Sequence, residues 1–272
     1  MSAAIDSTAT ATASKPLLAR MNWVRAAPWL YTLVLFVFWE LLVRWLEMPA
    51  TILPSPTRVF QAIGQYWSPI WKNSLQTLYT TTLGFIIAVV AGLGLGLFIG
   101  WSKTIYAGLY PLMIGFNAIP KVALVPILVI WFGIGTVPAV LTAFLISFFP
   151  IVVNVATGLA TIEPETEDVL RALGAKKMDI MLKVGIPRSM PYFFGSLKIA
   201  ITLAFVGSVV SETVASNYGL GNMMSSAQSQ FNVPLVFAGL LMLAVEGIAM
   251  YALMAWLEKR MTGWAHRSTM AN

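Results

Sequence analysis

The stretch EDVLRALGAKKMDIMLKVGIP, residues 167–187, is the most charged part of a chain that otherwise avoids charge. The 272-residue sequence is 58% hydrophobic and 10% charged, yet about a quarter of its Lys, Arg, Asp and Glu residues fall within this segment. Because soluble domains carry about 25% charged residues, the composition predicts an all-α membrane protein. Residues 167–187, here called the charged segment, need a separate explanation.

The first half of the charged segment has the pattern of a short helix. Pro164 suits a first helical turn, the helix runs to about Leu173, and Gly174 can adopt the left-handed backbone that ends it. Acidic residues complement the positive N-terminal end of this helix: Glu165, Glu167 and Asp168. Further candidate contact residues on the same segment are Arg171, Ala172 and Ala175.

The second half predicts another short helix with one apolar face. Asp179 and Lys183 can pair at i, i+4, and Pro187 is expected to stop the helix. Such a pair of helices can lie on a lipid surface, or it can insert into a groove on a partner protein. Composition by itself favours the lipid surface. The apolar stripe at i, i+3, i+4 consists of Met178, Met181 and Leu182.

Long apolar runs around this segment predict about six membrane-spanning helices, since a span needs about 20 apolar residues. The cations between them favour one side, which by the positive-inside rule is the cytosol and holds both termini and the charged segment. Cations confined to loops in this way do not indicate nucleic-acid binding. The expected spans are Ala26–Leu46, Leu75–Trp101, Ile105–Gly133, a fourth that ends near Leu159, Tyr192–Ser211 and Val233–Leu257.

Two features of these spans suggest how they pack. Ala88, Gly92, Gly96 and Gly100 form a smooth ridge, which lets helix backbones approach closely, within one chain or between two copies. The third span is interrupted by prolines, and broken helices at membrane depth are covered by protein or line a water-filled cavity. This break indicates either a central pathway or a packing kink. Its prolines are Pro111, Pro120 and Pro126.

Ionisable side chains within spans are candidate functional groups. Lys121 suits an anionic substrate, or it pairs with Glu212 or Glu246 in a purely structural role. Glu212 can contact an outer binding protein, line the path or cap the following loop. Glu40 is best explained by an i, i+4 pair with Arg44. Two amides in apolar surroundings are explained by hydrogen bonds between helices: Asn117 and Asn154.

Several classes of site have no sequence support. The chain has no cysteine and a single histidine, His266, so neither a metal site nor a catalytic triad is expected. No G-x4-G-K-[ST] phosphate loop occurs, so the chain is not expected to bind or hydrolyse ATP. An ion-coupled secondary transporter or channel is the alternative class. It would show an internal repeat or a carboxylate ion site at the midplane.

The charged segment resembles the cytoplasmic EAA loop of binding-protein-dependent ABC importer permeases, whose pattern is E-A-A-x3-G-x9-I-x-L-P. Asp168 stands at the Glu position, Gly174 at the glycine and Pro187 at the proline. Val169 and Leu170 replace the two alanines, and Val184, Gly185 and Ile186 fill the remaining positions. The resemblance covers roughly residues 50–260. It includes LPSPTRVF, IPKVALVPILVIWFGIG and VVSETVASNYGLGNMM, which are similar to the nitrate/sulfonate/taurine subfamily and its thiamine-pyrimidine precursor permeases.

This resemblance implies a type I ABC importer (MetI-like) permease fold in a bacterial inner membrane. It implies a homodimer, two cytosolic ATP-binding subunits that carry ATP and Mg and grip the loop, and an extracytoplasmic protein that delivers the substrate. The expected domains are a cytosolic tail at 1–22, an N-terminal helix and outer segment at 23–74, a permease core at 75–260 with its EAA-type loop at 162–190, and a cytosolic tail at 261–272.

Overall fold

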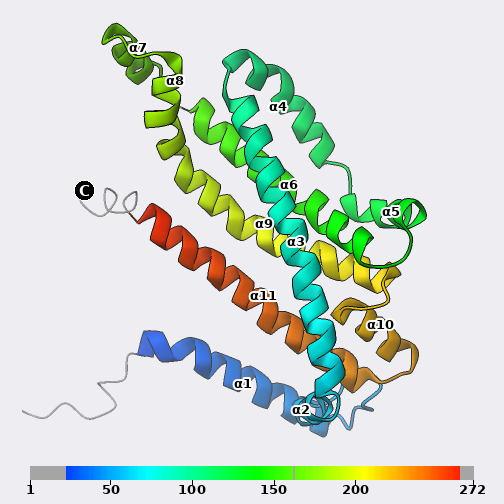
Figure 1. Cartoon of the computed structure of the whole chain (residues 1–272). Coiled ribbons are helices and arrows are strands. Elements are labelled where there is room, and N and C mark those ends of the chain that lie inside the picture. The colour runs from blue at the N-terminus through cyan, green and yellow to red at the C-terminus, as the bar shows by residue number, and fades with distance from the viewer. Residues whose placement is uncertain (1–22, 162, 264–272) are drawn as a thin grey trace, which may run out of the picture. The chain divides into compact units, whose positions relative to one another are not determined.

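The computed structural model describes residues 23–161 and 163–263, which form helices joined by short turns (Figure 1). The tail expected at 1–22 lies outside the described residues, as do residues 264–272, with His266, of the tail expected at 261–272. The chain divides into two compact units, residues 1–57 and 58–272. The helices are α1 Trp23–Trp45, α2 Pro56–Gln65, α3 Trp67–Gly100, α4 Lys103–Asn117, the 3-10 turn η2 Lys121–Leu124, α5 Val125–Phe132, α6 Thr136–Ala160, α7 Pro164–Ala172, α8 Lys177–Ile180, the π-helical turn η3 Met181–Gly185, α9 Ile186–Ala215, α10 Leu220–Ser229 and α11 Val233–Thr262.

The first unit is dominated by α1, whose apolar side chains are mostly exposed along the helix. An apolar exterior of this kind is what a lipid environment covers. Glu40 accepts hydrogen bonds from Arg44 Nε at 2.6 Å and from the Thr57 backbone N–H at 3.0 Å. The predicted Glu40–Arg44 pair is therefore confirmed.

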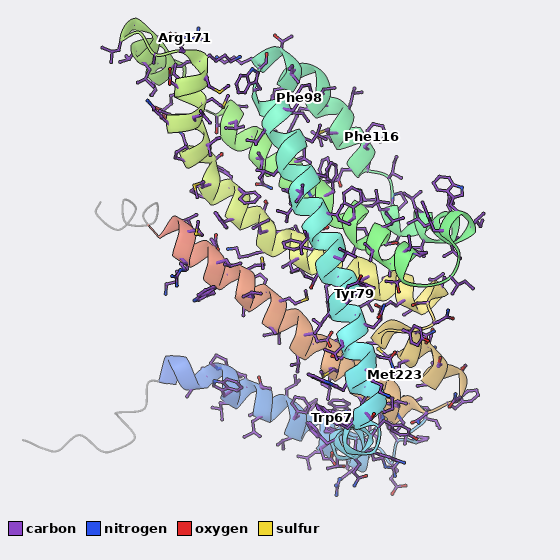
Figure 2. All side chains as sticks on the ribbon, viewed as in Figure 1. Trp67, Tyr79, Phe98, Phe116, Arg171 and Met223 are labelled. Carbon is purple, nitrogen blue, oxygen red and sulfur yellow. The ribbon has the colours of Figure 1, made fainter. Side chains whose placement is uncertain are left out.

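The second unit is built on α3, α6 and α9, with α11 packed against α9 (Figure 1). The end of α3, the end of α6 and the start of α9 lie at one end of this bundle, beside α7 and α8. Helix α10 lies at the opposite end, as the positions of Arg171 and Met223 show in Figure 2. Each long helix thus connects one end of the bundle to the other.

The glycine ridge of α3 packs on α6 within the chain. A Cβ atom added at Gly96 would lie 2.7 Å from the Cβ of Val155 and 3.0 Å from the carbonyl oxygen of Val152. The two backbones are therefore in near contact, as small residues permit between helices in lipid. The intramolecular explanation of the ridge is confirmed. Each glycine faces one α6 residue: Gly92 faces Ile151, Gly96 faces Val155 and Gly100 faces Leu159.

Five helices are long and apolar enough to cross a membrane, and a sixth span results if the bent pair 103–118 and 121–132 crosses as one. The number of spans agrees with the prediction. The pair bends by 71° at the Pro120 break, one of three prolines expected to interrupt this span. Pro111 lies inside α4, and Pro126 lies in the first turn of α5, where its missing N–H breaks no helical bond.

The expectation that Pro187 stops a helix is wrong. Residues 177–215 form one continuous helical run through this proline. The turn just before it, Met181–Gly185, is π-helical. A proline ring clashes with the preceding turn and removes one backbone donor, and the wider π turn accommodates both without ending the helix. The charged segment is therefore continuous with the long helix α9.

We expect Gly96→Ala to destabilise the folded chain by about 1–3 kcal/mol, because its methyl group would overpack the contact between α3 and α6. The measurement is thermal unfolding of the purified chain in detergent. Gly94→Ala is the matched control, since Gly94 lies on the same helix with nothing within 4 Å of an added Cβ. Equal melting temperatures for the two variants would contradict close packing at Gly96.

Candidate functional site

We call residues 163–187, which comprise the charged segment and the four residues before it, the charged loop. The charged loop begins with the predicted short helix. α7 runs from Pro164 to Ala172, and Gly174 has a φ of 88°. The Gly174 N–H donates to the carbonyl of Arg171 at 2.9 Å, and the Ala175 N–H donates to that of Leu170 at 3.0 Å. These bonds satisfy carbonyls that the end of a helix leaves free, and they need the left-handed backbone of glycine. The predicted hinge is confirmed.

Ion pairs fix the charged loop on its polar side. Asp179 and Lys183 form the predicted i, i+4 pair at 4.0 Å, and Arg171 pairs with Glu167 at 2.5 Å. Exposed pairs of this kind contribute less than about 1 kcal/mol each. Arg188 donates to Glu163 at 2.9 Å, which joins the start of α7 to the start of α9 and holds the pKa of the Glu163 carboxyl below its ordinary value.

The predicted apolar stripe of the second helix is divided between two faces. Met181 is buried against the core together with its neighbour Ile180, whereas Met178 and Leu182 are exposed. The π-helical turn begins at Met181, so the spacing of an ordinary α-helix does not hold there. The remaining predicted loop residues grade from exposed to half-buried: Asp168, Arg171 and Ala172 are exposed, and Ala175, Ile186 and Pro187 are half-buried.

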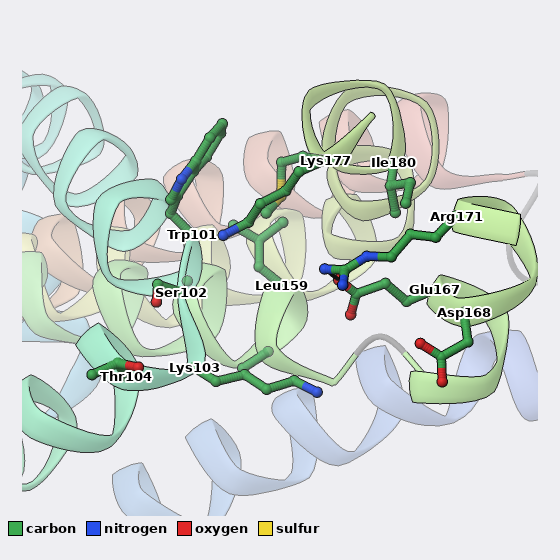
Figure 3. Close-up of a pocket in the computed structure, with 13 residues that line it drawn as sticks. Trp101, Ser102, Lys103, Thr104, Leu159, Glu167, Asp168, Arg171, Lys177 and Ile180 are labelled. Carbon is green, nitrogen blue, oxygen red and sulfur yellow. Dashed lines mark hydrogen bonds and ion pairs between the residues drawn. The ribbon is translucent and has the colours of Figure 1, made fainter. Parts of the chain in front are cut away.

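A cavity of about 420 Å³ lies where the charged loop meets the ends of α3 and α6 (Figure 3). Its wall carries charges of both signs, including Lys103, Arg171 and Glu167. The Lys177 ammonium lies 5.5 Å from the centre of the Trp101 ring, which places a cation over an aromatic face. The loop is thus held against the bundle on one side and free on the other.

A buried carboxylate joins three helices, α3, α9 and α10, near the opposite end of the bundle. Glu212 of α9 is fully buried and accepts hydrogen bonds from Thr77 Oγ1 at 2.8 Å and Thr80 Oγ1 at 3.0 Å, both on α3. It also accepts from the N–H of Gly221 in the first turn of α10, at 3.3 Å. Of the three roles considered for Glu212, the contacts support capping of the following loop.

The second buried carboxylate has a different environment. Glu246 of α11 is 4% exposed and contacts Ser74 Oγ through Oε1, while Oε2 has no partner among the described residues. Ser74 lies one helical turn before Thr77 on α3, so the carboxylates of Glu246 and Glu212 contact adjacent turns on the same face of α3. Neither forms an ion pair with Lys121, so the predicted pairing is wrong.

The hydroxyl groups that surround these carboxylates were not singled out from the sequence. Asn73 Oδ1 also accepts from the N–H of Gly219, and Thr77 Oγ1 accepts from that of Leu220. The stretch NSLQTLYTT carries a signal that identifies them, since its hydroxyl residues recur at i, i+3, i+6 on one face of an apolar helix.

The remaining polar candidates pair locally. Lys121 Nζ donates to Asn117 Oδ1 at 2.7 Å and to the Asn117 carbonyl at 3.0 Å. Asn154 Nδ2 donates to the carbonyl of Pro150 in its own helix, at 2.8 Å. The expected hydrogen bonds between helices are therefore replaced by bonds between residues four apart in the chain.

This arrangement is that of a multi-span membrane transport subunit: a bundle of long apolar helices, one broken span and a charged loop at one end. Residues 88–263 match the family described as binding-protein-dependent transport system inner membrane component. The chain is 33% identical to the formylaminopyrimidine transport permease protein ThiX of Halalkalibacterium halodurans, over 87% of this chain and 95% of that protein. It is 26% identical to the taurine transport system permease protein TauC of Escherichia coli, over 85% and 86%.

The chain therefore belongs to the family of binding-protein-dependent inner membrane components, the permease subunits of ABC importers. A solved structure of the MetNI methionine ABC transporter in an inward-facing conformation has the same fold. The TM-score is 0.60 at 20% identity, over 70% of this chain and 94% of that chain. These matches support the predicted MetI-like permease and not the alternative of a secondary transporter or channel.

We expect Glu212→Ala to loosen the start of α10. Thr77 and Thr80 can still donate to carbonyls of their own helix, but the buried Gly221 N–H loses its acceptor, at a cost of about 1–3 kcal/mol. Hydrogen exchange at the Gly221 amide should therefore become at least about tenfold faster. Glu165→Ala, at an exposed position of α7, is the control. Unchanged protection of Gly221 would show that Glu212 does not hold α10.

Proposed function

We propose that the charged loop docks into a groove of a separate ATP-hydrolysing subunit and transmits its movement to the membrane spans. The observation that carries this proposal is an exposed apolar surface on a compact element outside the spans. Leu173 is 79% exposed and Val169 is 60% exposed on α7, and Met178 and Leu182 of the second half of the loop are exposed as well. Apolar anchors surrounded by fixed charges are typical of a helix that inserts into a protein groove, with the charges setting its register.

The continuity of the charged loop with α9 gives the mechanical route. The loop passes through the π-helical turn directly into α9, which packs on α6 and α11 and carries Glu212 near its far end. The second half of the loop, residues 177–185, continues into α9 without a break, so a displacement of this half moves α9 with it. The helix α7, which precedes the Gly174 hinge, is tied to the start of α9 by the ion pair between Glu163 and Arg188. In energetic terms, the helix carries a coupling free energy between the nucleotide site of the partner and the solute path of this chain.

The distribution of cations supports a cytosolic position for the charged loop. Lys103 lines the cavity at the loop end of the bundle, Lys259 lies in the last turn of α11, and Lys198 of α9 pairs with Glu258 of α11 at 2.5 Å. By the positive-inside rule this end faces the cytosol, with both termini on that side of a bacterial inner membrane. The α10 end then faces outward, toward an extracytoplasmic binding protein.

The complete transporter would contain two copies of this chain and two ATP-binding subunits. ATP and Mg would be bound by those subunits, since this sequence has no phosphate loop, and the chain itself would act as a transport subunit rather than an enzyme. The relatives are named for formylaminopyrimidine and for taurine. The solute is accordingly a small molecule of that range: a sulfonate, taurine, nitrate, or a pyrimidine or other aromatic precursor.

We expect Leu173→Asp to reduce co-purification of the ATP-binding subunit by at least about tenfold, because it removes an apolar anchor and places a charge in a dry groove. The tagged chain would be isolated from its native host, the bound ATP-binding cassette subunit quantified by mass spectrometry, and ATP-driven uptake measured in parallel. Tyr218→Asp is the control, since Tyr218 is 65% exposed next to α10, away from the charged loop. Retention of the ATPase by Leu173→Asp would refute docking through this surface.

A further inference from the structure

The break between α4 and η2 borders a second cavity of about 470 Å³, which is open on one side and lined by residues of α3, α4, η2 and α6. Its walls are almost entirely apolar and include the rings of Phe116, Phe148 and Phe149. Ligand pockets typically measure 300–1,000 Å³ and combine apolar walls with a few polar groups. The volume suits a molecule of one or two rings, or a short alkyl chain.

Among the described residues, Lys121 is the one charged residue that lines this cavity. Its ammonium lies 5.7 Å from the centre of the Phe149 ring. Two of its three N–H groups donate to Asn117, and it forms no ion pair with any carboxylate among the described residues. One N–H of the ammonium therefore remains available.

A structural role accounts for only part of this arrangement. The bond from Lys121 to the Asn117 carbonyl satisfies a group that the end of α4 leaves free. A neutral donor would satisfy this carbonyl equally well. It does not offset the positive charge. α4 has 15 residues, about 22 Å of helix, so a span that starts at Lys103 places the break within a hydrocarbon core about 30 Å thick. Charges at that depth are costly unless they are paired, and broken backbone there lies against protein or a water-filled path.

We propose that this cavity binds the transported solute and that the solute is an organic anion with an apolar body, such as an alkyl or aryl sulfonate. The proposal rests on the proposed function, since it assumes that a solute passes through this chain. The free N–H of Lys121 and the Nδ2 of Asn117, which donates to no other described residue, supply donors for the anionic oxygens. The apolar body lies against Phe116 and Phe148. This chemistry selects a sulfonate over a neutral pyrimidine.

The test measures binding to the full chain in phosphatidylcholine nanodiscs by isothermal titration calorimetry. The probes are benzenesulfonate and the neutral, similarly shaped benzenesulfonamide. We expect wild-type chain to bind benzenesulfonate more tightly than the sulfonamide. Lys121→Met should weaken benzenesulfonate binding at least about tenfold, because a charge-assisted hydrogen bond is lost. Lys121→Arg, which keeps the charge, should retain binding.

The control variant is Lys259→Met, which removes the same charge at an exposed position outside the cavity. Folding of each variant is checked by size-exclusion chromatography and circular dichroism. Absence of benzenesulfonate binding to wild-type chain, equal binding by Lys121→Met, or equal affinity for the neutral sulfonamide would each overturn the proposal. So would loss of binding in nanodiscs that contain phosphatidylglycerol, because a lipid phosphate would then be the occupant.

The two proposals fail independently. Binding to the cavity needs neither ATP nor the ATPase, so Leu173→Asp should bind benzenesulfonate as wild-type chain does. Lys121→Met should still co-purify with the ATP-binding subunit. If wild-type chain co-purifies with the ATP-binding subunit but does not bind benzenesulfonate, only the proposed solute site is refuted. If it binds benzenesulfonate but Leu173→Asp keeps the ATP-binding subunit, only docking through the charged loop is refuted.

Discussion

The close approach of α3 and α6 is the contact on which the rest of the bundle depends. In lipid, burial of apolar surface gives no advantage to contact between helices, because the surrounding chains are as apolar as the side chains. The attraction that remains is van der Waals contact at short range. Glycines along α3 permit it, and at Gly96 the backbone lies so close to Val155 that an added Cβ would be only 2.7 Å from the Val155 Cβ. The same device recurs where α6 meets α9, since a Cβ on Gly207 would lie 3.1 Å from the carbonyl of Thr142. α6 therefore has little freedom to move relative to either neighbour.

Polar contacts add specificity to this tight packing. The hydroxyls of α3 reach Glu212 from a helix more than 130 residues earlier in the chain, and the same carboxylate accepts from the backbone of α10. Gly219, with a φ of 104°, allows the chain to pass close enough, because an added Cβ would collide with the carboxylate. Buried hydrogen bonds of this kind select one arrangement of helices among the many that apolar helix surfaces permit.

Local patterns in the sequence predicted local features well. The glycine ridge, the two-helix form of the charged loop and the hinge at Gly174 follow from spacing and backbone preference, which act over a few residues. The partners of Glu212 did not follow, since they depend on which helix faces which. Lys121 bonds to Asn117 four residues earlier, a local partner where a distant carboxylate was expected. Pro187 shows a different limit: a missing backbone donor indicates that the helix must adjust, but not whether it ends or widens into a π turn.

One hydrogen bond links the far end of α9 to the broken span. The N–H of Gly135, in the turn between α5 and α6, donates to the carbonyl of Ala215, the last residue of α9, at 3.2 Å. α9 is thus connected to the charged loop at its first residue and to the exit from α5 at its last. Under the proposed docking of the charged loop, a displacement of α9 would therefore reach the turn between α5 and α6 through this bond.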